Sequence, residues 1–368
     1  MEKSKFFFAS PTAVLGGAER TMFNLITYLL DDGHKVSMFI MSRGEQAGWE
    51  SIIAHPNFEM IIKNYKSEKT SLPAFFFSVF YLSHRNSYDY SFSSHTHVNG
   101  ALSLMRRLKV FKTKYLISRE STFIFERHEG AFRILLKFIY KFMYGSQDLV
   151  ICQTERMKTS LIQNLGFMPA KKIEVISNPV NLSYIKQQLK RNDFDEKPFE
   201  QLIVGCGRLI TLKKFNWLLE AFSSIAEEFP QAGIVIVGDG PERENLNNLV
   251  RDLGIEDRVV FTGKVSNPIR WFNKTDIGVI SSKIEGFPNV LIEMMASGTK
   301  QVITTPCTDG VNNIPYITVT ESCSREAIQK SLIEKLKNPV DNSKNHREYI
   351  EGNRSVEVFW RKVQEHLV

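Results

Sequence analysis

The sequence has few cysteines and no long hydrophobic run, and both absences narrow its class. Its four cysteines, among 368 residues, lie far apart and form neither a CxxC pair nor a cluster with histidine. We therefore expect no zinc site and a reducing compartment. The most apolar stretch, residues 72–82, is too short to span a bilayer. Residues 6–8 are too short an apolar run for a signal peptide. Together these features predict a cytoplasmic protein.

The sequence also lacks an aspartate pair placed after a strand, where a magnesium or manganese ion is commonly held. Asp193 and Asp195 have the DxD spacing, but they lie in a polar stretch that we interpret as a solvated charge run. No RNA-binding or zinc-finger motif is present, so we expect no nucleic-acid partner. The net charge is nevertheless +7, and residues 101–145 hold ten basic and three acidic residues. Such a basic surface suggests a phosphate or an anionic lipid as partner.

Short apolar runs alternate with segments of helical spacing along the whole chain. This alternation predicts parallel, doubly wound α/β sheets, and the length suffices for two domains. A polar, charged stretch near residues 186–200 predicts the linker between them. The expected strands are 5–10, 36–41, 60–62, 90–93, 114–118, 149–152 and 172–176 before the linker, and 202–206, 234–237, 259–262, 277–281 and 301–305 after it.

The most informative motif is the run EGFPNVLIEMMASG at residues 285–298. Gly286 and Pro288 interrupt the chain before an apolar helix, for which Asn289 is a suitable N-cap. Glu285 then lies on the loop, and Glu293 lies about one turn into the helix. Both carboxylates can face one ligand at a helix N-terminus, where free N–H groups and the helix dipole attract an anion such as a diphosphate.

Two glycine loops add further candidates for binding phosphate. Gly16 and Gly17 join the first strand to the first helix and allow close approach of the backbone. The loop at 207–214 carries Arg208 and Lys213, whose positive charges can neutralise a diphosphate. Lys214 follows directly, so either lysine can be the one that reaches the phosphate.

These motifs resemble those of the retaining GT-B glycosyltransferases of family 4, particularly bacterial enzymes that build capsular, O-antigen or glycan-linkage oligosaccharides. The resemblance extends from Gly16 to Gly298 and is strongest in the C-terminal half. It implies two Rossmann-like domains facing a central cleft. The acceptor domain would cover 1–185, the linker 186–200 and the nucleotide-sugar domain 201–350. A C-terminal helix over 351–368 would either cross back to the first domain or stay on its own.

The resemblance also implies the reaction, which is transfer of a hexose or N-acetylhexosamine from a UDP-sugar to a saccharide acceptor with retention. Glu285 would recognise the sugar and stabilise an oxocarbenium-like transition state, and Glu293 would bind the ribose. No cofactor or metal would be required, because cations and helix N-termini meet the charge of the diphosphate. The catalytic residues would be Glu285, Arg208 and Lys213; the donor-binding residues would be Gly16, Gly17, Arg208, Lys213, Phe287, Asn289, Val290 and Glu293.

The acceptor side departs from the family's usual pattern. Many relatives have a histidine on the loop after the fourth or fifth strand, but the loop after residues 115–118 begins Arg119-Glu120. An earlier loop carries His95 and His97. We therefore take His95, His97 and Glu120 as the candidate acceptor-side residues.

Residues 131–145 predict a helix on which Arg133, Lys137 and Lys141 share one face. Such a helix can lie on an anionic membrane surface, or it can be a buried helix with one solvated basic stripe. The first interpretation places the protein at the inner face of the cytoplasmic membrane and suggests a polyprenyl-diphosphate-linked acceptor. Two other functions remain open at this point, a nucleotide-sugar epimerase of GT-B-like fold and a non-catalytic nucleotide-sugar-binding protein.

Overall fold

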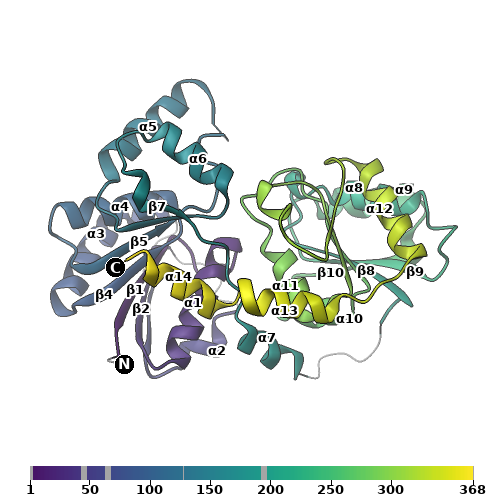
Figure 1. Cartoon of the computed structure of the whole chain (residues 1–368), viewed down its shortest axis with the longest axis horizontal. Coiled ribbons are helices and arrows are strands. Elements are labelled where there is room, and N and C mark those ends of the chain that lie inside the picture. The colour runs from purple at the N-terminus through teal and green to yellow at the C-terminus, as the bar shows by residue number, and fades with distance from the viewer. Residues whose placement is uncertain (1–2, 43–47, 63–67, 127, 192–196, 368) are drawn as a thin grey trace. The chain divides into compact units, whose positions relative to one another are not determined.

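The computed structural model describes residues 3–42, 48–62, 68–126, 128–191 and 197–367, and its chain forms two compact units. The first unit comprises Met1–Asn181 and Val356–Val368, and the second comprises Leu182–Ser355. Each unit contains one parallel sheet with helices packed around it (Figure 1). The predicted fold class, with two α/β domains and parallel sheets, is confirmed.

The sheet of the first unit has seven strands in the order β3-β2-β1-β4-β5-β6-β7. Strand β1, in the interior of this sheet, is an almost continuous apolar run and is buried along nearly its whole length, as expected of a strand covered on both faces. The strands are β1 (Lys5–Ser10), β2 (Lys35–Ile40), β3 (Phe58–Ile62), β4 (Tyr88–Ser93), β5 (Thr113–Arg119), β6 (Leu149–Cys152) and β7 (Ile173–Val175).

The helices of this unit include one from the far end of the chain. They are α1 (Gly17–Asp31), α2 (Glu50–Ile53), α3 (Glu68–Arg85), α4 (Thr96–Arg107), α5 (Gly130–Met143), α6 (Glu155–Asn164) and α14 (Val356–Glu365). The last helix, yellow in Figure 1, lies beside strands from the start of the chain. The Trp360 ring is 5.3 Å from the Phe6 ring and 5.1 Å from the Tyr90 ring. These aromatic contacts attach α14 to the first sheet.

The sheet of the second unit has six strands in the order β10-β9-β8-β11-β12-β13. Buried residues of α8, α9 and α12 cover one face of it as a single apolar core. The strands are β8 (Gln201–Cys206), β9 (Ala232–Val237), β10 (Val259–Gly263), β11 (Ile277–Ile280), β12 (Gln301–Thr304) and β13 (Thr318–Val319). The helices are α7 (Leu182–Leu189), α8 (Phe215–Ser223), α9 (Arg243–Asp252), α10 (Ile269–Lys274), α11 (Asn289–Ser297), α12 (Arg325–Lys337) and α13 (Ser343–Asn353).

The predicted linker at 186–200 is wrong at its start, because residues 182–189 form α7 and belong to the second unit. Ile185 and Gln188 are buried, and the Gln188 carbonyl accepts a hydrogen bond of 3.1 Å from Asn267. Lys186 and Gln187, at the start of this stretch, lie on the exposed side of that helix. Asp193 and Asp195 lie outside the described residues.

Both sheets reverse their strand order at one point. In the first sheet this point lies between β1 and β4, and in the second it lies between β8 and β11. In open parallel sheets, the loops that follow two such strands leave a crevice at the carboxyl edge, and ligands bind there. The loops after β1 and β4 carry Gly16 and His95, and those after β8 and β11 carry Lys213 and Glu285.

Candidate active site

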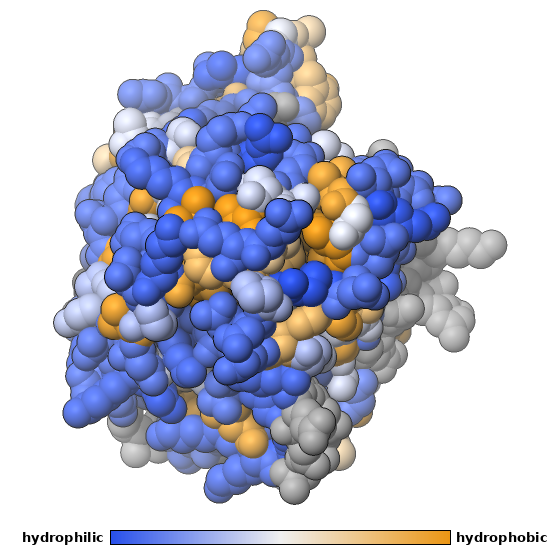
Figure 2. All heavy atoms as spheres, turned by 90° about the vertical axis from the view of Figure 1, so that its right-hand side faces the viewer, coloured by the Kyte–Doolittle hydropathy of each residue, from blue (hydrophilic) through white to orange (hydrophobic). Residues whose placement is uncertain are grey.

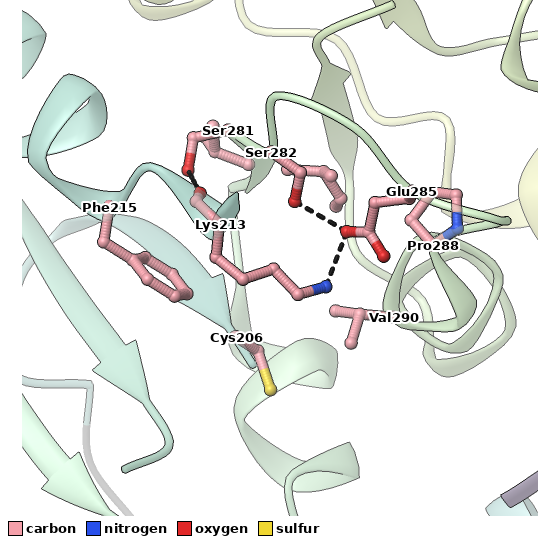
Figure 3. Close-up of a pocket in the computed structure, with 10 residues that line it drawn as sticks. Cys206, Lys213, Phe215, Ser281, Ser282, Glu285, Pro288 and Val290 are labelled. Carbon is pink, nitrogen blue, oxygen red and sulfur yellow. Dashed lines mark hydrogen bonds and ion pairs between the residues drawn. The ribbon is translucent and has the colours of Figure 1, made fainter. Parts of the chain in front are cut away.

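Lys213 and Glu285 meet at the reversal point of the second sheet. Lys213 Nζ lies 2.5 Å from Glu285 Oε1, and both side chains are mostly buried, at 22% and 13% exposure. They line a pocket together with Cys206, Phe215 and Val290 (Figure 3). The structure therefore brings together two of the three predicted catalytic residues, which are 72 positions apart in the chain.

Several hydrogen bonds hold Glu285 in place. Ser282 Oγ donates to Glu285 Oε1 over 2.6 Å, and the Glu285 backbone N–H donates to the Cys307 carbonyl over 3.0 Å. Within the described chain, the other carboxylate oxygen, Oε2, has no hydrogen-bond partner. One oxygen is thus fixed by a cation and a hydroxyl, and the other is available to a ligand. Burial, followed by the negative charge of Glu285, raises the pKa of the Cys307 thiol to about 12, so this neighbour stays neutral.

The loops after β8 and β11 are bonded to each other beyond the ion pair. Ser281 Oγ donates to the Lys213 carbonyl over 2.8 Å, as Figure 3 shows, and the Lys283 N–H donates to the Leu212 carbonyl over 2.8 Å. The sequence motifs did not point to Ser281 and Ser282. Their only signal was their place directly after a buried strand.

Two glycines in the turn after β9, Gly238 and Gly240, allow that turn to pack closely against the loop after β8. A Cβ on Gly238 would lie 2.0 Å from the Gly207 carbonyl oxygen, and one on Gly240 would lie 2.4 Å from that of Leu209. Gly238 also has a φ of +136°, which side-chain-bearing residues rarely adopt. The turn at residues 238–241, which reads GDGP, thus packs its backbone directly against the loop that carries Arg208. This contact supports a structural role for the turn.

Lys213 and Lys214 point to different partners. The ammonium of Lys214 lies 5.2 Å from the centre of the Trp217 ring, whereas that of Lys213 contacts Glu285 in the pocket. The Arg208 side chain is exposed, and it has no hydrogen-bond or ion-pair partner in the part of the chain that the structure describes. Lys213 is therefore the lysine that lines the pocket, and Arg208 lies on the same loop with no ion-pair partner among the described residues.

Helix α11 begins at Asn289, which is the residue that the sequence predicted as its N-cap. Its N-cap is Pro288, and Asn289 is the first helical residue, so the predicted N-cap role of Asn289 is wrong. The extended backbone of Pro288 suits a cap position, and no side chain caps the helix. Glu293 is the fifth residue of the helix and is half-buried. The N–H groups of the first turn of any helix point out of its N-terminus, because no carbonyl of the helix precedes them.

Phe287, which precedes α11, is buried and contacts Arg354, a residue that the sequence analysis did not single out. The guanidinium of Arg354 lies 4.8 Å from the centre of the Phe287 ring, and Arg354 is itself only 8% exposed. Arg354 follows α13 and stands beside Ser355, the last residue of the second unit. This contact connects the loop of Glu285 to the end of the second unit.

The first unit brings the glycine loop and a histidine together. His95 Nε2 lies 3.1 Å from Glu19 Oε1, and Glu19 is buried in the first turn of α1, two residues after Gly17. A Cβ on Gly16 would lie 2.9 Å from Glu19 Oε2. His97 is exposed, and its ring centre is 6.1 Å from that of His95. Glu19 is not among the predicted site residues, although it stands in the same GGAER run as the two glycines.

Glu120 lies elsewhere, in a buried network. Its two oxygens accept hydrogen bonds from the hydroxyls of Tyr144, at 2.7 Å, and Tyr140, at 3.1 Å, and further bonds from Asn99 and Thr96. The carboxylate is 1% exposed, so its acceptor sites are already used inside the protein. This placement argues against the predicted acceptor-side role and for a role in attaching α5. The neighbouring Arg119 is also fully buried, and burial lowers its pKa to about 10.

Comparison with known families covers both units. A family model described as Glycosyltransferase Family 4 matches residues 15–184, and one described as Glycosyl transferases group 1 matches residues 200–338. The chain is a family 4-type glycosyltransferase. Relatives agree with this membership. The glycosyltransferase is 27% identical to an uncharacterized glycosyltransferase of Haemophilus influenzae over 84% of this chain and 82% of that protein.

Two other relatives align over shorter lengths. An uncharacterized glycosyltransferase of Methanocaldococcus jannaschii is 28% identical over 62% of each chain. The Campylobacter jejuni N-acetylgalactosamine-N,N'-diacetylbacillosaminyl-diphospho-undecaprenol 4-alpha-N-acetylgalactosaminyltransferase is 29% identical over 56% of this chain and 54% of that enzyme. This glycosyltransferase thus matches less than two thirds of the length of both proteins.

Solved structures confirm the GT-B fold of the glycosyltransferase. Anabaena HepE, crystallised with UDP-glucose, superposes with a TM-score of 0.75 over 99% of both chains at 18% identity. Sucrose-phosphate synthase from Thermosynechococcus elongatus superposes with a TM-score of 0.76 over 99% and 98% at 17% identity. At these identities the likeness establishes the fold.

Proposed function

We propose that this glycosyltransferase moves a hexose or N-acetylhexosamine from a UDP-linked sugar to a saccharide acceptor, with retention of anomeric configuration. The observation that carries the proposal is the Lys213–Glu285 pair, which lies beside the first turn of α11 at the reversal point of the second sheet. A carboxylate held next to a cation and a helix N-terminus suits a ligand with a sugar at one end and a diphosphate at the other. The UDP-glucose bound to HepE, of the same fold, supports this donor class.

Each residue then has one role. Lys213, Arg208 and the N–H groups of Asn289 and Val290 offset the negative charge that develops on the departing diphosphate. Glu285 Oε2 faces the sugar, where its charge stabilises an oxocarbenium-like transition state. Glu293 accepts hydrogen bonds from the ribose hydroxyls. On the first unit, the loops that carry Gly16 and His95 contribute to sugar and acceptor binding.

The proposed acceptor is a saccharide linked to a polyprenyl diphosphate, and the pathway is surface polysaccharide or glycan assembly. The name of the Campylobacter relative contains diphospho-undecaprenol, and a Rhizobium meliloti relative, 29% identical over 55% of this chain, is named as a lipopolysaccharide core biosynthesis glycosyltransferase. Such an acceptor places the enzyme peripherally at the inner face of the cytoplasmic membrane.

The test is incubation with a panel of nucleotide sugars, with and without a lipid-linked saccharide acceptor. We expect transfer that depends on the acceptor and a product whose anomeric configuration, measured by NMR, equals that of the donor. Release of a free epimerised sugar without acceptor would identify an epimerase instead. Binding without any turnover across the panel would identify a non-catalytic binding protein.

Replacing Glu293 with alanine is expected to weaken the binding of UDP by roughly 1–3 kcal/mol, because charged hydrogen bonds to the ribose are lost. Isothermal titration calorimetry with UDP measures this directly. Glu351→Ala, an exposed glutamate on α13, is the matched control and should bind UDP normally. A folded Glu293→Ala variant with unchanged affinity would remove Glu293 from the ribose site.

Activity is expected to persist in EDTA, because Arg208, Lys213 and the start of α11 supply the positive potential for the diphosphate. Among the described residues, no group of three His, Cys, Asp or Glu side chains is arranged to hold a metal ion. Initial rates with EDTA, and with added Mn²⁺ after chelation, provide the measurement. Loss of turnover in EDTA that Mn²⁺ restores would refute the metal-free proposal.

A further inference from the structure

Helix α5 exposes an unusual number of large apolar side chains. Six of its residues are 39–66% exposed, and we call them the α5 apolar face: Phe132, Ile134, Leu135, Phe138, Ile139 and Phe142. At 100° per residue they span an arc of about 160° around the helix. Only Leu136 and Tyr140, on the opposite side, are buried. The structure thus decides against a buried helix with one solvated stripe.

The opposite side attaches α5 firmly to the first unit. The hydroxyls of Tyr140 and Tyr144 both donate to the buried Glu120, and the Tyr140 ring is 5.1 Å from that of Phe125. Burial, and then the charge of Glu120, raise the pKa of both tyrosines well above their usual value, so the hydroxyls remain donors. The apolar face therefore points outward from a helix that is held in a defined orientation.

Cations lie along one margin of this face. On a helical wheel, Arg133, Lys137 and Lys141 fall between the buried side and Ile134. Lys137 and Lys141 also line a groove with Phe138 and with Phe167, which follows α6 and is 38% exposed. The Arg107 guanidinium lies 5.6 Å from the centre of the Phe142 ring at the far end of the helix. Of the three acidic residues at 101–145, Glu120 is buried and Glu126 is paired with Arg156. Glu129 is exposed at the N-cap of α5, so the positive charges of the helix outnumber it.

The second unit has no comparable surface in its described residues. Its exposed large apolar side chains are Leu212, Val260, Tyr316 and Val340, which are distant in sequence. Figure 2, which looks at this side of the molecule, shows mostly hydrophilic side chains with smaller apolar areas between them. The concentration of apolar groups on α5 is therefore a local property of the first unit.

We infer that the α5 apolar face inserts into the surface of an anionic lipid bilayer, with Lys137 and Lys141 at the level of the headgroups. A helix with a broad apolar arc bordered by lysines suits this interface, because the lysine stems pack on apolar groups while their charges reach phosphates. A second copy of the chain is a poorer occupant, since a two-fold contact through α5 would bring equal positive charges together. None of the helices within the described ranges combines the length and the hydrophobicity of a membrane-spanning segment.

This inference rests on the proposed function only for the orientation of the enzyme toward a lipid-linked acceptor. The affinity for the membrane is expected to have two sources. Insertion of apolar side chains resists salt, whereas the attraction between lysines and anionic lipids is screened by it. Binding should therefore have two parts, of which only one disappears at high salt.

Sedimentation of the full chain with vesicles tests the inference. We expect binding to phosphatidylglycerol-containing vesicles that exceeds binding to pure phosphatidylcholine, and a part that survives high salt. The double variant F138S/F142S should lower the partition coefficient on the order of tenfold or more at any salt concentration. K137Q/K141Q should remove mainly the part that depends on salt. Y316S/V340S, which alters exposed apolar side chains of the second unit, is the matched control and should bind like the wild type.

Equal, negligible binding of the wild type to both vesicle types would overturn the inference. Normal vesicle binding by the F138S/F142S variant would also overturn it. A third contrary result would be a wild-type dimer, formed without vesicles, that the F138S/F142S substitutions dissociate. Vesicle binding is measured without turnover, so its failure is distinct from that of the proposed function. A protein that binds vesicles but transfers no sugar would contradict the latter alone.

Discussion

Replacing Glu285 with glutamine is expected to lower kcat about a hundredfold or more, which is the usual effect of removing a preorganised electrostatic stabiliser. Glutamine keeps the size of the side chain, and its carbonyl oxygen can still accept from Ser282 and Lys213. The variant loses mainly the negative charge beside the sugar. Initial rates at saturating donor and acceptor provide the measurement.

The fold of this variant should survive, because Glu285 lies on a loop and not in the core. Thermal unfolding followed by circular dichroism provides that control. Glu334→Gln, on the exposed side of α12, is the matched charge control and should retain wild-type kcat. Near-normal turnover of a folded Glu285→Gln variant would remove this carboxylate from the catalytic site.

Alanine at Arg208 or at Lys213 should likewise lower turnover about a hundredfold or more, since each removes a cation that we propose to face the leaving diphosphate. Lys213→Ala also leaves Glu285 with one donor fewer, so its effect and that of Glu285→Gln should not be additive. The double variant Lys213→Ala with Glu285→Gln is therefore expected to be less impaired than the product of the two single effects.

The Lys214→Ala variant tests whether turnover depends on Lys213 in particular or on the positive charge of the loop in general. Lys214 lies next in the chain and carries the same charge, but it packs against Trp217 rather than Glu285. We expect it to retain most of the wild-type turnover. Equal losses at Lys213 and Lys214 would show that the loop contributes only a diffuse positive potential.

The loop of Glu285 and every strand except β13 could be predicted, because their signals are local. Strand β13 has only two residues, which is too few to form a recognisable apolar run. A parallel strand covered on both faces is a short apolar run, as in Lys5–Ser10 and Ala232–Val237, and burial requires that composition wherever the strand lies. Glu285 and Glu293 stand on one loop and the helix that follows it, so their spacing alone brings them near one helix N-terminus. The local signal was less reliable at boundaries, where Pro288 rather than Asn289 caps α11.

Only the tertiary structure determined which side chains line the pocket and which are buried elsewhere in the protein. It paired Lys213 with Glu285 across 72 positions, gave Lys214 another partner, and buried Glu120 under two tyrosines. It also left the broad apolar side of α5 exposed. By itself, the sequence determined the local conformations and the composition of each helix face, because these depend on neighbours within a few residues. Whether a face is covered depends on segments that are distant in the chain, so burial and pairing appear only once the units are folded.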